Sequence, residues 1–160
     1  MATKKKAAKK KKAVRPASKT TRASAHPRAS RTAVAGMTAA TPGLTVADIE
    51  GSVAWYRDVL GFVVNERWES RGRLEAVEMR SGYVSFFLAQ DNWKKGRRRV
   101  KGQGVRIYCS TDRDVDLFAE HVQAQGSALT QLPTTEMGMR SFSVDDPDGY
   151  QITIWAGVKR

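Results

Sequence analysis

Short runs in which apolar and polar residues alternate fill the chain after residue 38. A period of two is typical of β-strands that bury one face. Glycine and aspartate punctuate the runs at turn positions, as at Ser81-Gly82. Eight runs read as strands: Thr41–Val46, Phe62–Trp68, Leu74–Arg80, Tyr83–Ala89, Val105–Cys109, Ser127–Leu132, Met137–Val144 and Tyr150–Trp155.

Two helical patterns interrupt these strands. In the first, apolar residues recur at helical spacing from Ile49 onward, after a capping aspartate, Asp48. The second starts at Asp112 or Asp114 and ends at Gly126. The order is strand, helix and three strands, and it occurs twice, which indicates an internal duplication of about 60 residues. We therefore predict an α+β fold, in which two tandem βαβββ modules form a curved mixed sheet around a cleft.

The sequence DPDGY at 146–150 predicts a tight turn that leads into the last strand. Beyond the turn, Ile152 and Ile154 fall on one face of the strand, and Thr153 and Trp155 fall on the other. The isoleucine face suits a core, whereas the hydroxyl and indole face suits the wall of a pocket.

Charge divides the chain near residue 36. Residues 1–35 hold 12 of the 28 Lys and Arg and no Asp or Glu, so the net charge of +12 belongs to this segment. It also has almost no large apolar residue, and we predict a disordered tail over 1–36. A folded domain is expected over 38–157, with modules at about 38–90 and 104–157.

The basic tail leaves two interpretations open. It can bind nucleic acid without reading sequence, because its lysines neutralise phosphates, or it can be a solubilising extension. Its composition resembles the tails of linker histones and histone-like bacterial proteins. The lysines that would bind nucleic acid are Lys4, Lys5, Lys6, Lys9, Lys10, Lys11 and Lys12.

The sequence has no apolar run long enough to cross a bilayer and no signal-peptide core. Its single cysteine, Cys109, lies inside a strand pattern, which favours a buried small side chain over a reactive thiol. We expect a cytoplasmic protein without a membrane partner, with a nucleoid-associated location as the alternative if the tail binds nucleic acid.

A polar connector, Gln90–Gln103, separates the two modules and contains the run WKKGRRRVK at 93–101. Two interpretations of its cations remain: a solvated loop, or an extension of the tail's polyanion-binding surface. Trp93 can cover a cleft, stack on a ligand or simply lie at the surface.

The strings LTVADIEGSVAWYRDVLGF at 44–62 and FSVDDPDGYQITIW at 142–155 resemble the vicinal oxygen chelate superfamily. This superfamily includes glyoxalase I, bleomycin resistance proteins and extradiol dioxygenases. The resemblance covers roughly residues 38–157 and implies two βαβββ modules with curved sheets. It also implies a homodimer.

Metal-using members of this superfamily place His or Glu at one inward position on each of four strands. By matching motifs, these positions fall at Thr41, Phe87, Val105 and Thr153. None is a metal ligand of the usual kind. The only histidines are His26, in the tail, and His121, in a helical pattern. We therefore expect no metal and no cofactor, assign no catalytic residue, and leave open whether the protein is an enzyme.

The leading hypothesis is a glyoxalase/bleomycin resistance-like protein that binds a small hydrophobic or aromatic molecule in a metal-free cleft. Arg140 can pair with a ligand carboxylate, or with Glu136 or Asp145. The apolar wall residues can also simply fill a collapsed cleft. The alternatives are a lyase or isomerase of the same superfamily and a nucleic-acid-associated protein that acts through its tail. The ligand-binding candidates are Trp68, Phe87, Val105, Ile107, Arg140, Thr153 and Trp155.

Overall fold

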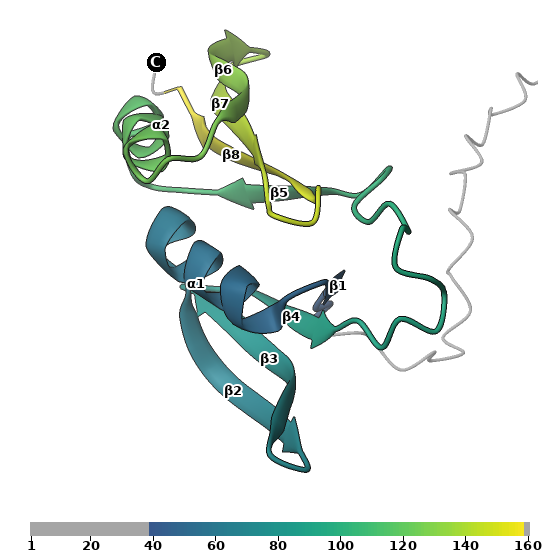
Figure 1. Cartoon of the computed structure of the whole chain (residues 1–160). Coiled ribbons are helices and arrows are strands. Elements are labelled where there is room, and N and C mark those ends of the chain that lie inside the picture. The colour runs from purple at the N-terminus through teal and green to yellow at the C-terminus, as the bar shows by residue number, and fades with distance from the viewer. Residues whose placement is uncertain (1–38, 159–160) are drawn as a thin grey trace, which may run out of the picture. The chain divides into compact units, whose positions relative to one another are not determined.

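A computed structural model describes residues 39–158, and the predicted tail lies outside these residues. The described part of the chain repeats the order strand, helix and three strands (Figure 1), which confirms the predicted α+β fold. Neither of its two helices is long and apolar enough to cross a membrane. The elements are β1 (Gly43–Val46), α1 (Ile49–Leu60), β2 (Val63–Ser70), β3 (Arg73–Ser81), β4 (Val84–Gln90), β5 (Arg106–Ser110), α2 (Val115–Ala124), β6 (Leu129–Glu136), β7 (Met139–Asp145) and β8 (Gln151–Gly157).

The N-terminal module is a four-stranded sheet in the order β1-β4-β3-β2, packed against α1. β1 runs parallel to β4, and the other neighbours are antiparallel. α1 begins after Asp48, whose carboxylate accepts a hydrogen bond from the Gly51 amide at 3.2 Å. The helix ends at Gly61, whose φ of 69° lies in the left-handed region that glycine adopts without strain. Both predicted caps are confirmed.

The C-terminal module repeats this arrangement in the order β5-β8-β7-β6, with α2 packed against it. Asp114 caps α2 by accepting from two amides of the first turn, which decides between Asp112 and Asp114 as the start. β6 continues to Glu136, beyond the predicted end at Leu132. It includes Pro133, which is tolerated because β6 is an edge strand with one side free of sheet hydrogen bonds.

One hydrophobic core joins the two modules and includes both helices. Tyr56 of α1 packs edge-on against Phe86 of β4, with ring centroids 4.8 Å apart. In the other module, Phe142 of β7 packs against Phe118 of α2, with centroids 5.7 Å apart. The core takes one face of each sheet, and the other face of each sheet lies outside it. We call these outer surfaces the open faces.

The turn between β7 and β8 connects the modules. Asp146 accepts a hydrogen bond from the hydroxyl of Tyr56 on α1 at 2.8 Å. The Tyr150 hydroxyl donates to the carbonyl oxygen of Thr45 on β1 at 3.1 Å. The DPDGY sequence therefore forms the predicted turn and also holds the N-terminal module against the C-terminal one.

Candidate functional site

The open face of the N-terminal sheet carries an aromatic pair. Phe86 and Leu88 of β4 are buried in the core, so Phe87 between them points to the open face. Trp68 of β2 contacts Phe87, with ring centroids 5.4 Å apart and an interplanar angle of 60°. Trp68 remains 40% exposed, so this pair leaves an aromatic surface on the open face.

The open face of the C-terminal sheet is polar. The hydroxyl of Thr153 on β8 lies 2.9 Å from that of Ser143 on β7, in a hydrogen bond that either can donate. The Ser143 hydroxyl also lies 3.4 Å from Oε1 of Gln131 on β6. A hollow of about 210 Å³ covers these groups and is also lined by Arg106 and Tyr108 of β5. Glu136, Met137 and Met139 also line the hollow, so this face combines hydroxyls, a guanidinium and a carboxylate with apolar contacts. The Ser143 and Thr153 side chains are themselves buried.

Four of the predicted pocket residues lie on the open faces, in two separate pairs. Trp68 and Phe87 lie on the N-terminal sheet, and Thr153 and Trp155 lie on the C-terminal sheet. Each open face lies outside the core that joins the modules. Among residues 39–158, no aromatic contact links the two pairs. The predicted pocket residues of a single chain therefore form two separate groups, one on each sheet.

The other three candidates lie elsewhere. Ile107 is in register with Ile152 on the core face of β5 and packs against the core. Arg140 donates from Nε to Asp116 of α2 at 3.1 Å, on the helix-covered side of β7, rather than to either carboxylate considered from the sequence. Val105 precedes β5 and is 42% exposed. We leave Ile107 and Arg140 out of the proposed site.

Tyr108 is a residue of the open face that the sequence interpretation missed. It lies in register with Thr153 and is 66% exposed. The signal was present in the sequence, because Cys109 was expected to be buried. Cys109 is indeed buried, and burial raises the pKa of its thiol to about 11. A period of two from Cys109 places Ile107 in the core and Tyr108 on the open face.

The residues at the metal-ligand positions implied by the resemblance do not fit a divalent metal. Thr41 precedes β1, and the β5 residue in register with Thr153 is Tyr108 rather than Val105. Phenyl, hydroxyl and phenol groups are not the imidazole and carboxylate set that such ions prefer. In the described part of the chain, no three His, Cys, Asp or Glu side chains gather closely enough to hold an ion.

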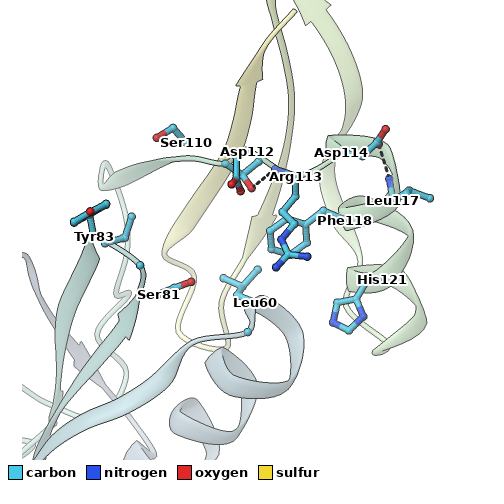
Figure 2. A pocket seen from close by; sticks show the side chains of 14 residues that line it. Leu60, Ser81, Tyr83, Ser110, Asp112, Arg113, Asp114, Leu117, Phe118 and His121 are labelled. Carbon is cyan, nitrogen blue, oxygen red and sulfur yellow. Dashed lines mark hydrogen bonds between the residues drawn. The ribbon is translucent and has the colours of Figure 1, made fainter.

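A larger hollow, about 1090 Å³, opens between the β3–β4 turn, the end of α1 and the start of α2 (Figure 2). The fold already uses much of its polar lining. Asp114 caps α2, and Nε2 of His121 lies 3.1 Å from the carbonyl oxygen of Asp58. No serine or threonine hydroxyl of this described lining is bonded to a histidine or a carboxylate. Among the described residues, this hollow therefore holds no hydroxyl paired with a base in the manner of a serine nucleophile.

Solved structures with this fold come from several bacteria. One is TnmS3, an antibiotic binding protein from Streptomyces sp. CB03234, with a TM-score of 0.59 and 20% identity over 76% of this chain and 99% of that chain. A second is TioX from Micromonospora sp. ML1, with a TM-score of 0.61 and 18% identity over 75% of this chain and 100% of that chain. A third is a lactoylglutathione lyase from Agrobacterium tumefaciens, with a TM-score of 0.57 and 20% identity over 76% of this chain and 96% of that chain.

Comparison with curated protein sequences finds no significant match. A family model described as the Glyoxalase/Bleomycin resistance protein/Dioxygenase superfamily matches residues 35–154, which is most of the chain. The match includes every described strand and both helices except the last residues of β8. The chain therefore belongs to the glyoxalase/bleomycin resistance protein/dioxygenase superfamily.

Proposed function

We propose that the protein binds a small hydrophobic or aromatic molecule without a metal. The observation that carries the proposal is the aromatic pair of Trp68 and Phe87 on an open sheet face, outside the core. Aromatic rings that serve only packing are normally covered by the chain itself, whereas these rings face outward. Flat apolar molecules stack on such surfaces.

The polar open face supplies the orienting contacts. Thr153 and Ser143 can each exchange a hydrogen bond with a ligand hydroxyl or carbonyl, and Arg106 can attract an anionic group. A ligand with one flat apolar part and one polar edge fits this combination. The similarity in fold to TnmS3, an antibiotic binding protein, shows that this fold can hold a small molecule.

Two copies of the chain are needed to assemble this site. The aromatic pair and the polar face lie on different sheets, and each is outside the core that joins the modules. A homodimer in which the N-terminal sheet of one copy faces the C-terminal sheet of the other brings the aromatic pair and the polar face together. It also covers Trp68 and Tyr108, which are 40% and 66% exposed in the single chain.

A binding screen tests the proposal. We expect light scattering to give a mass of twice 17.7 kDa. We also expect at least one flat aromatic compound in a thermal-shift screen to stabilise the protein, by about 2.7 kcal/mol at 100 times its Kd. Trp68→Ala is expected to lower the affinity for that compound about tenfold, because it removes half of the aromatic surface. Tyr83→Ala, at a fully exposed ring on the β3–β4 turn, is the matched control and should leave the affinity unchanged.

Three outcomes of the screen contradict the proposal. The first is a monomer at micromolar concentration, and the second is equal loss of affinity in Trp68→Ala and Tyr83→Ala. The third is compound binding that disappears with a chelator and returns with a stoichiometric divalent metal. Sustained turnover of a 2-oxoaldehyde–thiol adduct or a catechol without added metal, lost on substitution of residues of the folded domain, would instead support the lyase or isomerase alternative.

A second function is proposed for the tail, which we infer binds nucleic acid without sequence specificity. The supporting observation is its charge, with 12 Lys and Arg and no acidic residue in residues 1–35. Deletion of these residues is expected to weaken binding to duplex DNA at least tenfold at about 0.1 M salt, because released counterions drive such binding. Equal binding of the full chain and the deletion at this salt would contradict it. A nucleoid-associated location rests on this binding.

A further inference from the structure

The connector between the modules concentrates positive charge in the folded domain. Residues 91–104, which we call the basic connector, contain six Lys and Arg and one acidic residue, Asp91. After residue 35 the chain has as many acidic as basic residues, so the rest of the domain carries an excess of acidic ones. A local cluster of positive charge on an otherwise acidic domain indicates one place where an anionic partner would bind, which a uniformly basic surface does not.

Two of the six cations maintain the shape of the connector. Arg99 donates to Oδ2 of Asp91 at 2.8 Å, and this pair closes the loop between them. Nζ of Lys101 lies 3.6 Å from Asp91 and 3.2 Å from Asp148 in the β7–β8 turn. The amide of Trp93 and the guanidinium of Arg99 hold the pKa of the Asp91 carboxyl below its usual range. The connector is therefore anchored by charge pairs, of which those of Lys101 with Asp91 and Asp148 are buried on both sides.

Trp93 helps to hold the shape of the basic connector, and its ring is covered rather than free to stack on a ligand. Its backbone takes a left-handed φ of 59°, held by a hydrogen bond from its amide to Asp91 at 2.8 Å. Arg97 and Lys101 lie over the ring at 5.0 and 4.9 Å from its centroid. The indole is thus occupied by two cations, and stacking on a base would have to displace them.

The four remaining cations reach solvent, and one of them, Arg97, also packs on Trp93. They lie in two successive turns separated by Gly96, and all four are exposed: Lys94, Lys95, Arg97 and Arg98. Within residues 39–158, none of the four has a carboxylate oxygen within 4.0 Å. Clustered cations repel one another, and a phosphate-rich partner relieves that repulsion.

We propose that the basic connector is a binding surface for the phosphate backbone of a nucleic acid. The proposal assigns nucleic-acid binding to the folded domain, separately from the small-molecule site and from the tail. A polymer is favoured over a small anion because the exposed cations follow one another along residues 94–98, where successive phosphates of one backbone can each meet a cation. A membrane surface is disfavoured because Val100 is the one large apolar side chain that the described connector exposes, and the ring of Trp93 is covered by Arg97 and Lys101.

The test compares two triple variants of the full chain. One is Lys94→Gln, Lys95→Gln and Arg98→Gln, which keeps the cations that pack on Trp93 or pair with Asp91. The other removes the same charge at exposed arginines outside the connector: Arg71→Gln, Arg73→Gln and Arg113→Gln. Affinity for a fluorescent duplex of about 30 base pairs is measured between about 0.05 and 0.2 M salt. Thermal unfolding checks that both variants are folded.

The connector variant is expected to bind about tenfold more weakly at about 0.1 M salt, and its slope of log K against log salt should fall by about 2 to 3. The control variant should stay within about twofold of the original chain. If both variants lose the same affinity for the duplex, the loss follows from net charge alone and the proposal is overturned. Unchanged affinity of the connector variant for the duplex would also overturn the proposal. The separate proposal for the tail would still stand if deletion of residues 1–35 abolished binding. Connector-dependent binding to phosphatidylserine vesicles, but not to the duplex, would overturn it in favour of a membrane.

Discussion

Replacing Asp146 by alanine is expected to lower the free energy of unfolding by about 3–5 kcal/mol. The carboxylate is 5% exposed and accepts from the Tyr56 hydroxyl and from the amides of Asp148 and Tyr150, at 2.8, 2.9 and 2.8 Å. Alanine leaves these donors without their partner, and each buried unpaired donor costs about 1–3 kcal/mol. Urea unfolding followed by circular dichroism measures the loss.

The neighbouring aspartate provides the matched control. Asp145 is exposed, so Asp145→Ala should change stability by less than about 0.5 kcal/mol. Tyr56→Phe removes only one of the three hydrogen bonds to Asp146 and should cost about 1–2 kcal/mol. In the double variant the two losses should not add, because both remove the same contact. If Asp146→Ala costs no more than Asp145→Ala, the turn does not hold the modules together.

The change of stability with pH gives a second test of the environment of Asp146. Burial raises the pKa of its carboxyl above the unfolded value, in spite of the hydrogen bonds it accepts. The part of its contribution that depends on protonation is therefore fully present below the unfolded pKa and is lost as the pH rises through the folded pKa, whereas the hydrogen bonds that the carboxylate accepts remain. Asparagine does not titrate, so the stability of Asp146→Asn relative to the original chain should rise with pH across that window.

The sequence was sufficient to predict the fold because local rules and the global pattern agree. The caps at Asp48 and Gly61 and the turn at DPDGY depend on a few neighbouring residues, and the structure confirms them. The extent of β6 depends on pairing with β7 across two register shifts, which no local pattern encodes. The strand therefore passes through Pro133, where the sequence alone favoured an end.

The candidate site was harder to predict because it depends on which face each strand buries. The alternation in β8 was unambiguous, since Ile152 and Ile154 flank Thr153, and the structure buries both isoleucines. In β5, Cys109 is buried, and Ile107, two residues earlier, lies on the same face and packs against the core. The partner of Arg140 is Asp116, on a helix 24 residues earlier, and only tertiary packing brings these two together.

Gly102→Ala is expected to destabilise the protein by about 3–4 kcal/mol, although glycine and alanine differ by one methyl group. Gly102 has a φ of 68°, and a Cβ at this position would overlap the carbonyl group of Gly149 and the amide nitrogen of Tyr150. These are backbone atoms of the DPDGY turn, which the contacts of Asp146 hold in place, so they cannot move aside at low cost. The connector must therefore shift away from the turn.

Gly104→Ala separates this steric cost from backbone strain. Gly104 has a similar φ of 77°, but a Cβ there has no atom within 4 Å. Both variants bear the left-handed penalty of about 1–2 kcal/mol, and only Gly102→Ala should add the overlap. Urea unfolding of the two variants should therefore differ by about 2 kcal/mol. In Gly102→Ala, faster amide exchange is also expected in the connector, because Lys101, the preceding residue, loses its position beside Asp148. Equal stability of the two variants would mean that the connector yields to the methyl group, and that its contact with the turn is not what fixes it.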